Sequence, residues 1–190
     1  MALDGDGTEV RGAGSQLGWL LWAGALAAAP AAAAAERLCR PDVLTEFGLR
    51  TLSADSPAFE PHAYHRGSIW PFDSWLGWGG LRACGREAEA ARVRTGVLAA
   101  IQRLGDAPEL YAVTRAGELE PIALSNHRQA WTAGARWALA NRWDGGGLLE
   151  SSAAPDGGAF VESSAAPDGG AFVAWSAAPD GGALGSAHTA

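Results

Sequence analysis

The sequence predicts an all-α fold built from helical hairpins. Apolar residues recur at helical spacing in five segments, and these segments carry start and stop signals that are typical of helices. Two intervals without convincing periodicity, residues 40–69 and 105–124, hold most of the unusual side chains. Because compact helix bundles connect their helices in a few residues, loops of this length indicate a functional role. Helical hairpins whose loops gather on one face therefore describe the chain better than a four-helix bundle.

The first two helices are expected on either side of a proline. A cap at Ser15 begins a helix that runs to about Ala29, and Pro30 suits the first turn of a second helix that ends near Cys39. The uncharged run 18–35 also resembles a signal peptide or a membrane span. Acidic residues dominate its upstream flank and alanine drives insertion poorly, so we predict a buried helix pair instead.

Three further helices are expected, at Pro71–Cys84, Glu87–Leu104 and His127–Trp143. Gly85 supplies the stop signal for the first of these, because glycine adopts the left-handed conformation that ends many helices. The second carries an apolar face at helical spacing. Ser125 is the expected cap of the last helix.

The charge balance of the chain excludes two classes of partner. The formal net charge is −7, from 14 basic and 21 acidic residues. No broad positive field is available to hold a phosphate backbone or an anionic membrane, so neither nucleic acid nor a membrane is expected as a partner. Two cysteines, Cys39 and Cys84, do not make a disulfide framework, which favours reduced thiols and a cytoplasmic location. No metal, nucleotide or other cofactor signature is present.

The segment PHAYHRGSIWPFD, residues 61–73, concentrates aromatic and polar side chains directly before a predicted helix. In an apolar core, its two histidines, its arginine and its aspartate would each need a polar partner. An open pocket with an aromatic floor accommodates this mixture more favourably. The chain also has 9 tryptophans, whose flat apolar faces match the CH-bearing face of a pyranose. These residues favour a sugar-processing α/α toroid.

Five motifs in a fixed order carry a family resemblance. They are SQLGWLLWAGAL at 15–26, PDVLTEFGLRTLS at 41–53, YHRGSIWPFD at 64–73, PELY at 108–111 and QAWTAGA at 129–135. Together they resemble the C-terminal part of bacterial glycogen-debranching, amylo-α-1,6-glucosidase-like proteins, which are related to glucoamylase, trehalase and mannosylglycerate hydrolase. The chain departs from the family pattern after PELY, where Ala112 and Val113 replace the usual Cys-Gly turn.

The resemblance implies an inverting glycoside hydrolase on an (α/α)6 barrel, a toroid of six helical hairpins of which this chain holds the C-terminal portion. Inversion needs one carboxyl group to protonate the leaving oxygen and another to activate water on the opposite face. In the family the loop that matches PELY supplies the base, which makes Glu109 the expected general base. The acid comes from an earlier hairpin without a counterpart in this chain. The isolated chain is therefore expected to be inactive without the missing N-terminal half.

The resemblance further implies that YHRGSIWP lies along the subsite for the terminal sugar of an oligosaccharide or α-glucoside. Aromatic side chains would stack on the sugar or contact its hydroxyl groups, and Gly67 would let the backbone approach. The expected substrate-binding residues are Tyr64, His65, Gly67, Ser68, Trp70, Asp73, Gln129 and Trp131.

The catalytic and binding assignments have structural alternatives. The segment around Trp70 could be only an entry loop, with Tyr64 packed over the start of a helix, and Asp73 faces either the pocket or the neighbouring helix. Glu109 could be an ordinary surface glutamate. Its rivals for the catalytic role are Glu118 and Glu120.

Three other side chains have alternatives of the same kind. Trp22 and Trp131 lie at apolar spacing on predicted helices, which is typical of core tryptophans as well as of ligand platforms. Arg50 could serve only to brace a loop through hydrogen bonds.

Two domains follow from these patterns: a partial α/α-toroid glycosidase domain at residues 1–149 and a low-complexity tail at 150–190. The tail repeats ESSAAPDGGAFV twice and then gives AWSAAPDGGALG. Each copy has too few apolar residues to offset the entropy of ordering, so a flexible tail is expected. Three hypotheses on function follow: the base-bearing part of an α-glucosidase, a carbohydrate-binding remnant without catalysis, or a truncated product without independent activity.

Overall fold

The computed structural model describes residues 2–3, 5–10 and 12–143. The repeat tail predicted for residues 150–190 and the domain boundary predicted after residue 149 lie outside these residues. Within the described residues helices provide most of the regular structure, which confirms the predicted all-α class.

The described helices are α1 Gln16–Trp22, α2 Ala28–Leu38, α3 Pro71–Ala83, α4 Glu87–Leu104 and α5 Ala130–Asn141. Three antiparallel pairs of short strands accompany them: β1 Ala2–Leu3 with β2 Glu9–Val10, β3 Leu44–Thr45 with β4 Gly48–Leu49, and β5 Tyr111–Val113 with β6 Leu119–Pro121. The predicted bounds of α3 and α4 agree with the structure to within one residue. Pro71 begins α3, and Gly105 ends α4 at a φ of 78°.

The predicted bounds of two helices are wrong. α1 ends at Trp22 instead of about Ala29, because Gly24 adopts a φ of 60° and turns the chain out of the helix. α5 begins at Ala130, where the side chain of Gln129 accepts a hydrogen bond from the Ala130 N–H at 3.1 Å. The expected cap, Ser125, instead accepts a hydrogen bond from the N–H of Leu110 at 3.2 Å.

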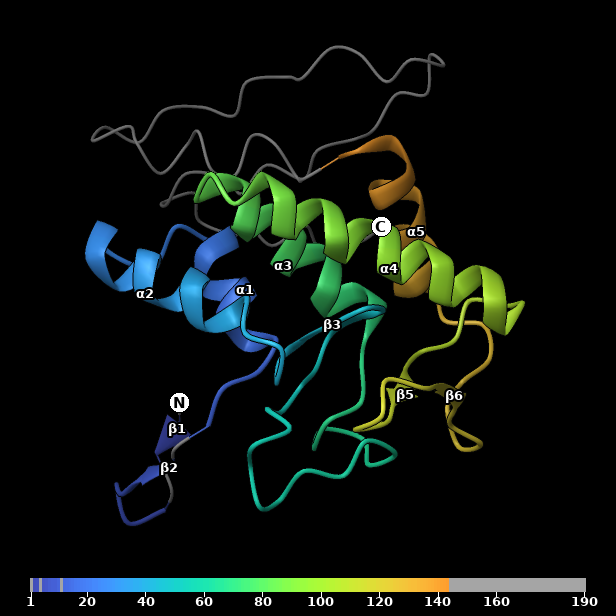
Figure 1. The fold of residues 1–190 in the computed structure, drawn as a ribbon, viewed down its shortest axis with the longest axis horizontal. Coiled ribbons are helices and arrows are strands. Elements are labelled where there is room, and N and C mark those ends of the chain that lie inside the picture. Colours follow the sequence, from blue (N-terminus) through green and yellow to red (C-terminus); the bar gives the residue numbers. More distant parts are fainter. Residues whose placement is uncertain (1, 4, 11, 144–190) are drawn as a thin grey trace, which may run out of the picture.

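α3 is the central helix of the structure. It packs against α1, α4 and α5, while α2 packs against α1 and α4 also contacts α5. Leu76, Trp78 and Leu81 on α3 are buried, and the larger of the two hydrophobic clusters draws side chains from all five helices. The arrangement is therefore one of consecutive hairpins, α1 with α2 and α3 with α4, with α5 beside the second (Figure 1).

The backbones of α1 and α3 touch along a seam of glycines. A Cβ atom on Gly18 would lie 2.5 Å from the Cα of Gly77, and a Cβ on Gly80 would lie 2.7 Å from the carbonyl oxygen of Gly18. The expected buried helix pair is buried on only one face of α1, because Trp19 and Leu20 are each 42% exposed. The glycine seam buries one face of α1 and leaves the other face open.

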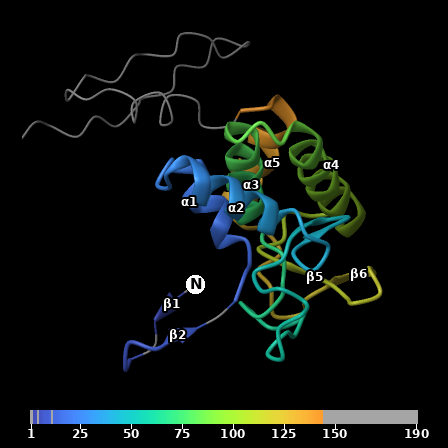
Figure 2. The same ribbon diagram turned by 60° about the vertical axis from the view of Figure 1, so that its left-hand side comes forward.

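The two long loops lie together on one side of the helices, as the two views of Figures 1 and 2 show. Ile69 and Tyr111 join them through backbone hydrogen bonds of 2.8 and 3.0 Å. The buried hydroxyl of Tyr111 donates to the carbonyl oxygen of Phe47 at 2.6 Å. The two loops, which are separate in the sequence, are thereby held side by side.

The side chain of Arg50 links these two loops through hydrogen bonds. Its guanidinium is buried, donates to the carbonyl oxygens of Val113 and, at 2.9 Å, of Thr114, and lies 4.9 Å from the ring centroid of Phe59. Burial, followed by the charge of Arg115, lowers the pKa of Arg50 to about 10. The loop-bracing interpretation of Arg50 agrees with these contacts.

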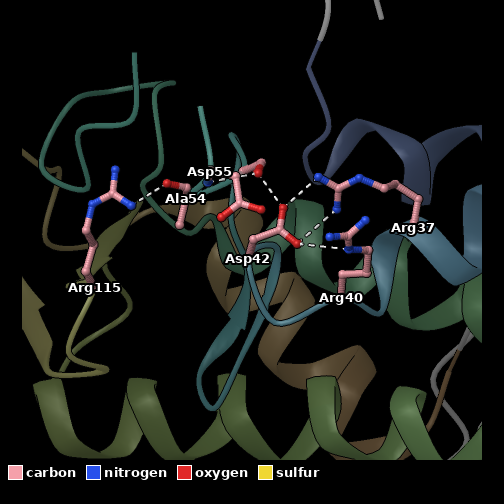
Figure 3. A network of polar contacts seen from close by, with 7 residues as sticks. Arg37, Arg40, Asp42, Ala54, Asp55 and Arg115 are labelled. Atoms are coloured by element: carbon pink, nitrogen blue, oxygen red, sulfur yellow. Dashed lines mark hydrogen bonds and ion pairs between the residues drawn. The ribbon is translucent and has the colours of Figure 1, made fainter. Parts of the chain in front are cut away.

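Asp42 is the centre of a polar network that ties the first loop to the end of α2 (Figure 3). Its side chain is only 8% exposed and accepts hydrogen bonds from Arg37 at 2.6 and 3.2 Å and from the hydroxyl of Ser53. Arg40 adds an ion pair at 3.6 Å. Burial by itself would raise the pKa of Asp42, but the hydrogen bonds from Arg37 and Ser53 and the charge of Arg37 outweigh it and hold the pKa below its usual value.

We expect Asp42→Asn to lower the free energy of unfolding at neutral pH by about 2 kcal/mol, because it removes charge-assisted hydrogen bonds from a buried site. Since the folded-state pKa of Asp42 is depressed, its contribution is present above the pKa of the unfolded chain and is lost as pH falls through the folded-state value. Urea unfolding at neutral and acidic pH should show that the deficit of the variant shrinks on acidification. The matched control is Asp55→Asn at the exposed neighbour in Figure 3, and an equal deficit in both variants would contradict the network.

Candidate active site

Glu109 is half-buried in the loop between α4 and β5, and both of its carboxylate oxygens accept hydrogen bonds. The hydroxyl of Tyr64 donates to Oε1 at 2.7 Å, and the N–H of Asn126 donates to Oε2 at 3.4 Å. The N–H of Glu109 itself donates to the carbonyl oxygen of Asn126 at 2.8 Å. Two other segments of the chain thus orient this carboxylate.

Tyr64 belongs to a cluster of aromatic rings that all come from the segment 61–73. Its ring lies edge-on to Trp70 at 4.8 Å and to His65 at 4.6 Å, and His65 stacks on Trp70 at 5.1 Å with an interplanar angle of 13°. The carbonyl oxygen of Tyr64 accepts hydrogen bonds from Trp70 Nε1 at 3.0 Å and from Ser68 Oγ at 2.7 Å. The chain therefore folds back on itself and presents these rings beside Glu109.

A cavity of about 260 Å³ adjoins this cluster. It is lined by Trp19, His65, Trp70, Phe72, Asp73 and Trp131. Trp131 is 44% exposed and lies 6.3 Å from both Trp70 and Phe72, measured between ring centroids. Trp131 is therefore a wall of an open aromatic pocket and no core residue, whereas Trp22 is half-buried and lies outside the cavity lining.

The structure places four predicted substrate-binding residues outside the lining of this cavity: Tyr64, whose ring packs against Trp70, and Gly67, Ser68 and Gln129. Ser68 is fully buried, and Gly67, at a φ of 140°, leaves room for the ring of Phe59, since a Cβ there would lie 2.4 Å from that ring. Gln129 caps α5. The contacts of Gly67, Ser68 and Gln129 are with the protein itself, and their place in the sugar subsite stays a prediction.

Two lining residues were absent from the sequence-based site. Phe72 stands inside the motif YHRGSIWPFD and could have been inferred from it. Trp19 stands on α1, in the motif SQLGWLLWAGAL, and only its exposure beside the glycine seam reveals it.

The rivals of Glu109 have different surroundings. Glu118 is exposed in the turn between β5 and β6. Oε2 of Glu120 lies 2.7 Å from Nε2 of His62, and Nδ1 of the same ring lies 3.6 Å from Oε1 of Glu60. Of the three glutamates, it is Glu109 whose carboxylate is hydrogen-bonded to the aromatic cluster, through Tyr64.

A second cavity, of about 480 Å³, is larger. It lies between the β3–β4 turn and α4. Its lining combines small residues of α4, such as Ala91 and Gly96, with the charged side chains of Glu46, Arg92 and Arg103. Among the residues that the structure describes, no group of three or more His, Cys, Asp or Glu could hold a metal ion. Nor does any described helix combine the length and the hydropathy that crossing a membrane requires.

The Tyr64–Glu109 contact can be tested by titration. The hydrogen bond to Glu109, and to a lesser degree burial and the charge of Glu109, raise the pKa of Tyr64. The sequence has only one other tyrosine, Tyr111, and burial raises its pKa as well. In Glu109→Gln we expect the pKa of Tyr64 to fall toward its ordinary value, measured by ultraviolet titration with Tyr111→Phe to assign the signal. An unchanged pKa of Tyr64 would contradict the contact, and Glu118→Gln should leave it unchanged.

Comparison with known proteins identifies the family. The family described as "Mannosylglycerate hydrolase MGH1-like glycoside hydrolase domain" matches residues 2–132. The chain belongs to this family. The described residues accordingly form part of an α/α-barrel glycoside hydrolase domain.

Three solved structures from Thermus thermophilus are similar to the chain. One is an uncharacterized conserved protein, with 28% identity and a TM-score of 0.54 over 70% of this chain and 31% of that chain. The second is a GH63 mannosylglycerate hydrolase in complex with glucose, with 28% identity and a TM-score of 0.54 over 70% of this chain and 30% of that one. The third is the same hydrolase in complex with Tris and D-glycerate, with 27% identity and a TM-score of 0.52 over 70% and 30% of the two chains.

The chain thus spans less than a third of the length of these structures. None of the curated proteins compared with the chain matches it.

Proposed function

We propose that this chain supplies the general base and the aromatic part of the sugar pocket of an inverting α-glycoside hydrolase. One observation carries the proposal: the carboxylate of Glu109 is bonded to Tyr64, which packs against the aromatic wall of the cavity. Membership of the glycoside hydrolase family supports the reaction class.

In this proposal Glu109 takes a proton from a water molecule as the water attacks the anomeric carbon. A general base must be ionised and within hydrogen-bonding reach of the proton that it takes. Oε1 already accepts the hydroxyl of Tyr64 at 2.7 Å, whereas the contact of Oε2 with the N–H of Asn126 is long, at 3.4 Å. Oε2 therefore has the greater free capacity to accept the proton. The acid that protonates the leaving oxygen would come from the N-terminal half of the enzyme, as the family resemblance implies.

The proposed substrate is an α-linked hexoside, with an α-glucoside first among the candidates. Flat indole faces in the cavity match the CH-bearing face of a pyranose. The amylo-α-1,6-glucosidase resemblance points to a glucosyl branch, whereas the solved neighbours are a mannosylglycerate hydrolase with glucose or with Tris and D-glycerate. A cytoplasmic setting fits the two unpaired thiols, Cys39 and Cys84.

The deciding experiment uses a reassembled enzyme, in which the N-terminal half of the family is supplied in cis or in trans. We expect it to hydrolyse at least one member of a panel of α-1,6-glucosides, glucosylglycerate and mannosylglycerate, and to release the β-anomer first in a proton NMR time course. Initial release of the α-anomer would overturn the inverting mechanism. Turnover of no member of the panel would overturn the proposed activity.

A second candidate, carbohydrate binding without catalysis, is favoured by one observation: this chain supplies an aromatic cavity lined by four rings of Trp and Phe together with His65 and Asp73. The isolated chain is expected to show no hydrolysis, because one carboxylate without its partner cannot protonate the leaving group. Binding of sugar by a reassembled enzyme that remains inactive would select this second candidate.

A further inference from the structure

The cavity is lined by three separate parts of the sequence, and Trp19 is the part that the sequence-based site lacked. Trp19 is on α1, whereas the other lining residues belong to the segment 65–73 and to α5. Its ring meets Phe72 edge to face, with ring centroids 5.5 Å apart and an interplanar angle of 71°. Because Trp19 remains 42% exposed, much of its apolar surface is left open at the cavity.

Asp73 holds Trp19 in this position. Its Oδ1 accepts a hydrogen bond from Trp19 Nε1 at 3.1 Å, and its Oδ2 accepts one from the hydroxyl of Ser15 at 2.7 Å. Ser15 is fully buried, and its N–H donates to the carbonyl oxygen of Arg50 at 2.8 Å. Asp73 also lies in the first turn of α3, where the helix dipole favours a carboxylate.

We propose that Trp19 is a sugar-contacting residue of the cavity and that Asp73 is the positioning residue that orients its indole. Both oxygens of Asp73 are bonded to donors at α1 and its cap, and in this proposal the carboxylate acts on the sugar through Trp19. The inference deepens the proposed function and rests on it, since it names a residue and a role that the family motifs did not supply.

Binding of methyl α-D-glucopyranoside to the 190-residue chain tests the first half of the inference. The indole N–H resonances of the tryptophans report the contact, and we expect those of Trp19 and Trp131 to shift on titration while that of Trp137 stays in place. Trp19→Ala should raise the Kd about 10-fold, the effect typical of losing one aromatic partner. The matched control is Trp137→Ala on α5, whose side chain is 46% exposed and lies outside the cavity lining.

A double-mutant cycle tests the positioning role of Asp73. We expect Asp73→Ala to weaken binding about as much as Trp19→Ala and to add nothing in the Trp19→Ala background. Asp73→Asn keeps an acceptor for the indole N–H and should restore most of the affinity. In the sugar-free chain, the indole N–H resonance of Trp19 should move in Asp73→Ala and stay close to its original position in Asp73→Asn.

Each outcome decides a different point. Equal affinity of Trp19→Ala and Trp137→Ala, with normal binding by the unsubstituted chain, overturns the role of Trp19 and leaves the proposed hydrolase function standing. A further loss on adding Asp73→Ala to Trp19→Ala makes Asp73 a direct sugar ligand and overturns its positioning role. Absence of binding by the unsubstituted chain overturns the sugar pocket itself. Circular dichroism of each variant separates these results from unfolding. Trp19→Phe, which keeps a ring but loses the indole N–H, replaces Trp19→Ala if that variant does not fold.

Discussion

Glu109→Gln in the reassembled enzyme should lower kcat by about 10²–10⁴-fold and leave substrate affinity nearly unchanged. Glutamine preserves the shape of the side chain and can still accept the hydroxyl of Tyr64 through its carbonyl oxygen. It cannot take a proton from water at neutral pH, so the loss falls on the chemical step. Steady-state kinetics on the best substrate of the panel, together with sugar binding to the same variant, measure the two effects separately.

The controls for this prediction are the two other glutamates of the same region. Glu118→Gln changes an exposed turn residue, and Glu120→Gln disrupts only a contact with His62 between two side chains that are each more than 40% exposed. Both variants should retain most of the turnover. If Glu109→Gln stays near normal while either control abolishes turnover, the base has been assigned to the wrong residue.

Gly18→Ala should lower the free energy of unfolding by about 1–3 kcal/mol, the usual cost of forcing an extra carbon into a packed interior. The new Cβ would lie 2.5 Å from the Cα and 3.0 Å from the N of Gly77. Both are backbone atoms of α3, so neither can move aside as the end of a flexible side chain could, and α1 must shift away from α3. Urea unfolding followed by circular dichroism measures the loss.

Gly134→Ala is the matched control, because Gly134 lies within α5 and a Cβ there would meet nothing within 4 Å. This variant should be neutral or raise the free energy of unfolding by up to about 1 kcal/mol, since alanine favours the helix over glycine. If Gly18→Ala is tolerated as well as Gly134→Ala, the close contact of α1 and α3 is wrong. That result would also remove the geometry that brings Trp19 to Asp73.

The sequence by itself determined the elements whose signals are local. Pro71 and Gly105 carry their own backbone preferences, φ near −65° for proline and a left-handed φ for glycine, so the start of α3 and the end of α4 follow from residue type. The location of residues 61–73 outside the apolar core also follows from the sequence, because burying their charged and polar side chains without partners is costly. The motifs around it led to Glu109 and to the family.

The tertiary structure decided which side chains reach the cavity. Gln129 caps α5 instead of Ser125, because the segment between them bonds to the loop of Glu109: the N–H of Gln129, for example, donates to the carbonyl oxygen of Ala107 at 2.9 Å, a long-range contact that no local pattern encodes. Ser68 and Trp70 are two residues apart in the chain, yet the turn buries the first beneath Tyr64 and sets the second in the cavity wall. Trp19 entered the site only because Gly18 and Gly77 let two helix backbones touch, which sets its indole beside Asp73, 54 residues away. Such placements depend on long-range packing. Helical periodicity predicts which face of a helix is buried, but it does not predict which other helix packs against that face.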